Sequence, residues 1–121
     1  MMRFIGLIVV TLGLGTLAAA ASAADGEQVF LFYCAQCHGT GGKGDGPNVT
    51  KFLPVSPRDF TDAVEMNKLT DAHMAQVIRD GGPAISKSAM MPGWVDTLND
   101  EEIAVLVTHI RKLCDCPGKQ E

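Results

Sequence analysis

The stretch Cys34-Ala35-Gln36-Cys37-His38 says more about this 121-residue chain than any other part of the sequence. Its two cysteines and its histidine stand at positions i, i+3 and i+4, which lie on one face of an α-helix. A helix over this stretch would therefore point two thiols and one imidazole in the same direction. What the chain does therefore depends on which group the two thiols and the imidazole bind together.

A Cys-x-x-Cys-His run is the pattern of covalent c-type haem attachment. Two thiols at this spacing can add to the two vinyl groups of one haem, while the imidazole lies under the iron. The sequence therefore predicts one haem c bound through Cys34 and Cys37, with His38 as an axial ligand of the iron.

Three other uses of the cysteines compete with haem attachment. A thioredoxin-like pair needs a strand before it and a neighbouring βαβ pattern, and the sequence offers no such strand. A structural zinc site could combine Cys34 and Cys37 with Cys114 and Cys116. A plain disulfide between Cys34 and Cys37 suits an oxidising compartment. The zinc site leaves His38 and the methionine loop without a role. Cys114 and Cys116 could also form a disulfide with each other or with another subunit.

The second axial ligand decides what such a haem would do. Coordination by histidine and methionine is the electron-transfer arrangement, because the methionine raises the reduction potential and fills the sixth site. Met74 lies on a helical apolar stripe and Met66 has no distinguishing context, whereas Met90 and Met91 lie in a loop bounded by proline and glycine. Pro92 drives the residue before it toward extended geometry, so we favour Met91 over Met90.

The remaining pattern predicts an all-α domain of about three or four short helices joined by long loops. Helices are expected over 25–38, from an N-cap at Thr70 to the glycine pair after residue 80, and from Asn99 onward, where Glu102 completes a capping box. No stretch alternates with the period of a strand. Loops this long count against a compact domain, unless they wrap a large cofactor.

The N-terminal segment predicts export. Arg3 is the only charged side chain among the first 24 residues, the run that follows it is apolar or small, and a small-x-small cleavage signal ends at Ala23. We expect a signal peptide over 1–23 and a monohaem domain over 24–121, exported or periplasmic. The run is also long enough to span a bilayer, so an uncleaved membrane anchor is the minority alternative.

Seen together, these features make the sequence resemble the class I c-type cytochromes over nearly all of its predicted domain. Gly26 and Phe30 precede the Cys-x-x-Cys-His run at the spacing at which that family places a glycine and an aromatic residue, where its last helix crosses the first. Leu106 and His109 hold the matching positions on the last helix. The family often carries an aromatic residue where His109 stands, so the contact would be weaker or replaced by a hydrogen bond.

The resemblance implies a cytochrome c-like fold around one covalent haem. It also implies roles in the haem site for two further residues. The segment around Pro47 resembles the family segment whose proline carbonyl accepts a hydrogen bond from the haem histidine, so Pro47 would orient His38. Met91 followed by Pro92 matches the family's axial methionine and the proline after it.

These observations predict a periplasmic electron carrier that is not itself an enzyme. Its partners would be a redox donor and a redox acceptor that dock transiently. The net charge of −4 argues against nucleic acid or an anionic membrane as partner, and no membrane span is expected after signal cleavage. The alternatives are an electron-transfer subunit of a larger oxidoreductase and, with less support, a haem enzyme or gas sensor with an open sixth site. The oligomeric state is not indicated.

Overall fold

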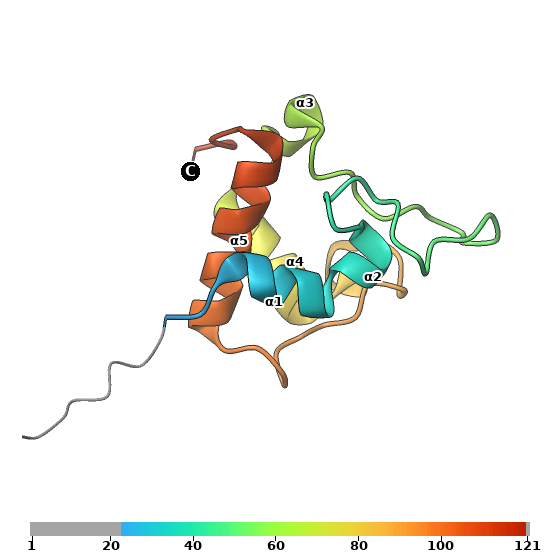
Figure 1. Cartoon of the computed structure of the whole chain (residues 1–121), viewed down its shortest axis with the longest axis horizontal. Coiled ribbons are helices and arrows are strands. Elements are labelled where there is room, and N and C mark those ends of the chain that lie inside the picture. Colours follow the sequence, from blue (N-terminus) through green and yellow to red (C-terminus); the bar gives the residue numbers. More distant parts are fainter. Residues whose placement is uncertain (1–22, 121) are drawn as a thin grey trace, which may run out of the picture.

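The computed structural model describes residues 23–120, and all regular structure in this range is helical (Figure 1). The elements are α1 (Gly26–Tyr33), α2 (Ala35–His38), α3 (Ala63–Met66), α4 (Asp71–Asp80), the 3-10 helix η1 (Gly82–Ile85) and α5 (Asp100–Cys114). The all-α prediction is confirmed, although the short α3 and η1 were not expected. Of the predicted signal peptide, residues 1–22 lie outside the part of the chain that the structure describes.

The helix expected over 25–38 is divided at Cys34. Asp25 begins α1 by accepting a hydrogen bond from the backbone N–H of Glu27, and Cys34 joins α1 to α2 with φ −112° and ψ −32°. The bonds from Cys34 N to the Phe30 carbonyl and from His38 N to the Cys34 carbonyl, both 2.9 Å, keep the helical ladder nearly continuous. The three groups of the motif therefore stay close to a helical arrangement.

Helices α1 and α5 cross at the positions that the sequence predicted. Gly26 lies so close to the Val105 carbonyl that a Cβ atom there would overlap it. Phe30 and Leu106 are both 0% exposed at this crossing. The ring of His109 packs against that of Phe30 with centroids 5.0 Å apart, so the crossing contact is kept although an imidazole replaces the family's aromatic ring.

The two long helices begin where their caps indicated. Thr70 accepts a hydrogen bond from His73 N at 3.0 Å, and Asn99 and Glu102 form a reciprocal capping box with both bonds at 2.9 Å. These caps satisfy N–H groups that the helix itself leaves free. The apolar faces of α4 and α5 then pack together with α1 around one core: Phe30, Ala35, Met66, Met74, Ile78, Leu98, Ile103, Leu106, Val107, Ile110, Cys114 and Cys116.

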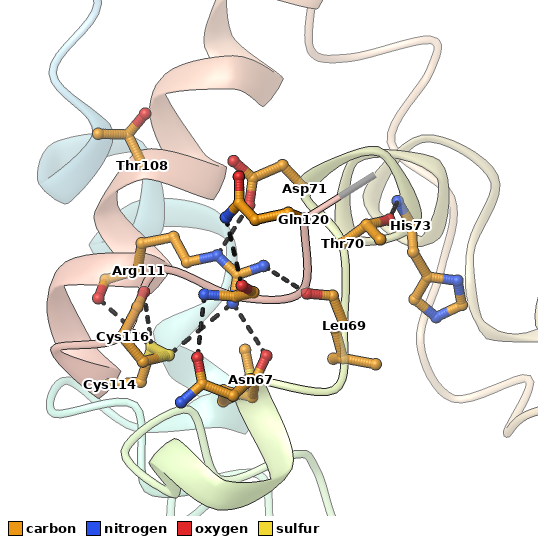
Figure 2. Close-up of polar contacts among 12 residues, drawn as sticks. Asn67, Leu69, Thr70, Asp71, His73, Thr108, Arg111, Cys114, Cys116 and Gln120 are labelled. Carbon is orange, nitrogen blue, oxygen red and sulfur yellow. Dashed lines mark hydrogen bonds and ion pairs between the residues drawn. A yellow bond between two sulfur atoms is a disulfide. The ribbon is translucent and has the colours of Figure 1, made fainter.

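The C-terminal end of α5 is tied to the connection between α3 and α4 (Figure 2). Arg111 donates to the Asp71 carboxylate at 2.7 Å, to the Met66 carbonyl at 2.9 Å and to the Leu69 carbonyl at 2.7 Å. A disulfide joins Cys114 to Cys116 across the turn that ends the helix. The pairing is therefore within the two residues, one of the arrangements the sequence left open.

Two long loops complete the domain. The loop between α2 and α3 runs outward from the helices in Figure 1, and the loop after η1 leads back to α5. Across residues 23–120, no helix combines the length and the apolar character needed to cross a membrane.

Candidate haem site

The two motif cysteines are free thiols on the α1–α2 segment. Cys34 and Cys37 are half-buried and are not bonded to each other. Burial, with a smaller contribution from the neighbouring Cys37, raises the pKa of Cys34 to about 11, so the thiol stays protonated at neutral pH. Two thiols that are not joined in a disulfide are both available to add to vinyl groups.

The competing uses of the cysteines do not fit this geometry. Cys114 and Cys116 are bonded to each other, so they cannot complete a zinc site with the motif cysteines. Over the part of the chain that the structure describes, no three His, Cys, Asp or Glu side chains are grouped to hold a metal ion. The same residues contain no strand before the motif, as a thioredoxin-like pair would require.

The imidazole of His38 is held in one orientation by the segment before α3. Its Nδ1 donates to the carbonyl oxygen of Arg58 at 3.1 Å, and its ring stacks on that of Phe60 with centroids 4.4 Å apart and planes 18° apart. A carbonyl can only accept, so Nδ1 carries the proton and Nε2 keeps its lone pair. Burial lowers the pKa of His38, with the Arg58 bond opposing, so the ring is neutral at pH 7 and able to bind a metal.

The prediction that the Pro47 carbonyl orients His38 is wrong, because the Arg58 carbonyl holds that position. Pro47 is exposed, and the residues on either side of it bond to the backbone of α2. Phe60 N donates to the Gly42 carbonyl at 2.7 Å and so draws the later segment over the imidazole. The role of Arg58 was missed because it uses a backbone carbonyl, which every residue type possesses. Its side chain instead pairs with Glu65 at 3.8 Å.

The four candidate methionines fall into two groups. Met66 and Met74 are 0% and 6% exposed and belong to the apolar core, as expected for Met74 from its place on the helical stripe. Met90 is 61% exposed, whereas Met91 is half-buried and its carbonyl accepts from Gly82 N at 2.9 Å. Met91 is thus more buried than Met90, which favours Met91 as the ligand.

The loop that carries Met91 is attached both to α4 and to the haem-motif helices. Trp94 N lies 3.0 Å from the carbonyl oxygens of both Ile78 and Arg79, which anchors the loop to the end of α4. The Trp94 ring meets the Tyr33 ring edge-on, with centroids 5.3 Å apart, directly before Cys34 in the chain. The loop therefore lies beside the segment that carries the two thiols.

These groups fit a c-type haem. A neutral imidazole with a free Nε2 and a thioether sulfur are the donors that hold haem iron in electron-transfer cytochromes. Two free thiols on the same segment are the groups that covalent attachment requires. Fold and site together define a c-type cytochrome.

Residues 21–110 match the family described as cytochrome c oxidase, cbb3-type, subunit III, and the chain belongs to this family. Its cofactor is accordingly covalently bound haem c.

Solved structures and a curated relative agree with this assignment. The chain is similar to the structure titled KustC0563 c-type cytochrome, at 29% identity and a TM-score of 0.59, over 74% of this chain and 98% of that one. It is similar to a chain of the Kuenenia stuttgartiensis reducing HAO-like protein complex Kustc0457/Kustc0458, at 32% identity and a TM-score of 0.58, over 73% and 40% of the two chains.

The curated relative is the cbb3-type cytochrome c oxidase subunit FixP of Bradyrhizobium diazoefficiens, 26% identical over 91 residues. The match covers 75% of this chain but only 27% of FixP. The chain thus spans about a quarter of the length of that relative, and it corresponds to one part of it.

Proposed function

We propose that this protein is an exported carrier of single electrons whose haem c is attached through Cys34 and Cys37 and ligated by His38 and Met91. The observation that carries the proposal is the hydrogen bond from His38 Nδ1 to the Arg58 carbonyl. It places the proton on Nδ1 and so leaves Nε2 for iron, on the same short segment as two unpaired thiols.

Bound haem c supplies an iron centre that takes up and releases one electron at a time. The residues of the chain determine how that centre behaves. Two thioether bonds prevent loss of the group, the Arg58 carbonyl fixes the tautomer of His38, and Met91 closes the other side against small ligands. The protein converts no substrate of its own, and its partners are a redox donor and a redox acceptor.

The cellular setting follows from the N-terminal sequence. We propose a signal peptide over 1–23 and a mature monohaem domain over 24–121, delivered to the periplasm or an equivalent exported compartment. The mass of the purified holoprotein tests this directly. A mass matching a chain that begins at Ala24 (or one residue later) supports export with cleavage, whereas the full-length mass would favour the membrane anchor.

Two settings are open to an exported carrier. The match to the KustC0563 c-type cytochrome covers 98% of that chain, so a domain of this kind can make up a whole c-type cytochrome chain, which supports a free shuttle. The FixP and HAO-like relatives support a subunit of a larger oxidoreductase. Size-exclusion chromatography of the native extract separates the two: elution at the mass of the single chain supports the shuttle, and stable co-elution with a larger protein supports the subunit.

The identity of the second axial ligand gives the first prediction. Met91→Ala should remove the weak far-red absorption band of the iron–methionine bond, lower the reduction potential and open the iron to carbon monoxide. Met90→Ala is the matched control, because its side chain is mostly exposed, and it should change none of the three. Loss of the band in Met90→Ala alone would assign the ligand to Met90. A wild-type protein that binds carbon monoxide rapidly would instead indicate a sensor or enzyme.

A further inference from the structure

His109 occupies an unusual position in the apolar crossing of α1 and α5. Its Nε2 is buried and has no hydrogen-bond partner among residues 23–120. A buried polar atom without a partner costs about 1–3 kcal/mol, so an imidazole here is less favourable than the aromatic ring expected at this crossing. The hydrogen bond considered from the sequence is not formed.

The charges that face His109 come from both helices at the crossing. Asp25 and Glu27, at the start of α1, favour the protonated ring. Lys112, about one helical turn further along α5, disfavours it. Burial is the largest influence and lowers the pKa of His109 below its ordinary value. The ring is therefore neutral at pH 7, and acid converts it to a cation next to two carboxylates.

A continuous column of rings leads from His109 to the candidate iron ligand. The His109 and Phe30 centroids are 5.0 Å apart, those of Phe30 and Phe60 are 6.1 Å apart, and those of Phe60 and His38 are 4.4 Å apart. Phe30, in the middle, is 0% exposed. Two packed rings, with no gap between neighbours, therefore separate His109 from His38.

We propose that His109 tunes the haem: its protonation places a positive charge at the end of the Phe30–Phe60 column on which His38 rests, and so couples the reduction potential to pH. The inference rests on the proposed ligation by His38. Protonated His109 adds a positive charge, and ferric haem carries one positive charge more than ferrous haem. Protonation therefore favours the ferrous state, and the potential rises as pH falls through the pKa of His109.

The coupled step balances as one electron and, at most, one proton. On reduction the iron gains one electron from the redox donor, and His109 gains a proton from water in the pH range between its ferric and ferrous pKa values. On oxidation both leave, the electron to the acceptor and the proton to water. Linkage is reciprocal, so the pKa of His109 must be higher in the ferrous protein than in the ferric protein.

Potentiometric titration of the holoprotein over about pH 4.5 to 8 tests the proposal. The chain contains three histidines, and with His38 on iron the two that remain are His73 and His109. Wild-type protein and His73→Gln should show the same rise in potential below about pH 6.5. His109→Phe, which restores an aromatic ring to the column, should lose that rise and keep only the slope from groups common to all three proteins. An unchanged slope in His109→Phe would overturn the proposal.

A second measurement uses the wild-type protein alone and so does not depend on the folding of a variant. The imidazole proton resonance of His109 is followed by NMR through a pH titration in the reduced and in the oxidised protein. A higher pKa in the reduced protein supports the coupling, and equal pKa values contradict it. An intact far-red band together with equal pKa values would reject this inference and leave the proposed function standing, whereas absence of haem would reject both.

Discussion

At the scale of single residues, the surroundings of His38 determine what the site can bind. The Arg58 carbonyl and the Phe60 ring contact the imidazole from two directions. Neither contact uses a charged side chain, and both come from the segment that Gly42 holds in place through its carbonyl. The path of the backbone between α2 and α3 therefore determines how the His38 imidazole is oriented.

The Phe60 contact gives a prediction about stability. Phe60→Ala removes the stack on His38 and the edge contact with Phe30. We expect a loss of about 2 kcal/mol in the free energy of unfolding, below the range for a fully buried phenylalanine because Phe60 is only half-buried. Phe52→Ala is the same substitution at a ring that is 83% exposed, and it should change stability by less than about 0.5 kcal/mol. Urea unfolding of both holoproteins measures the difference, and equal losses would contradict the assigned role.

At the scale of elements, the crossing of α1 and α5 organises the molecule. It requires the smallest residue at Gly26 and a large ring at Phe30, and it leaves His109 in contact with that ring. The haem motif follows directly after α1, and the Arg111 contacts lie near the end of α5. Separating the two helices would therefore disturb both ends of the domain.

Gly26→Ala tests this crossing. The added methyl group would overlap the Val105 carbonyl, and overpacking of this kind costs about 1–3 kcal/mol. This exceeds the gain of up to about 1 kcal/mol that alanine brings to a helix. Gly41→Ala is the matched control, since a Cβ there meets nothing within 4 Å. Thermal unfolding should show a lower Tm for Gly26→Ala alone; a tolerated Gly26→Ala would mean that the helices can move apart without cost.

At the scale of the whole molecule, the described chain has a small apolar core and two long loops. A domain of this size buries little surface and often needs a cofactor to be stable. A group that binds only the folded chain stabilises it. We therefore expect covalent haem c to contribute to the stability of the fold.

We expect the protein without haem to be largely unfolded. The double variant Cys34→Ala/Cys37→Ala, produced without haem, should show low helicity by circular dichroism and no cooperative melt, while the holoprotein melts cooperatively. Native helicity with a cooperative transition in the double variant would show that the polypeptide folds without its cofactor. Reduced helicity with a retained transition would limit the role of haem to the loops.

The features that the sequence determined by itself are those that depend on neighbouring residues. The Cys-x-x-Cys-His spacing, the Thr70 and Asn99 caps and the apolar face of α5 all follow from helical geometry within a few positions. The crossing residues Gly26 and Phe30 were found by resemblance to a family, and the packing confirms them.

Only the tertiary structure decided which distant groups meet. A backbone carbonyl carries no residue signature, so Arg58 could not be distinguished from Pro47 before the chain path was known. The column from His109 to His38 likewise brings together rings from α5, α1, the segment before α3 and α2. Local spacing thus determines which chemistry the chain carries, and packing determines what surrounds and tunes it.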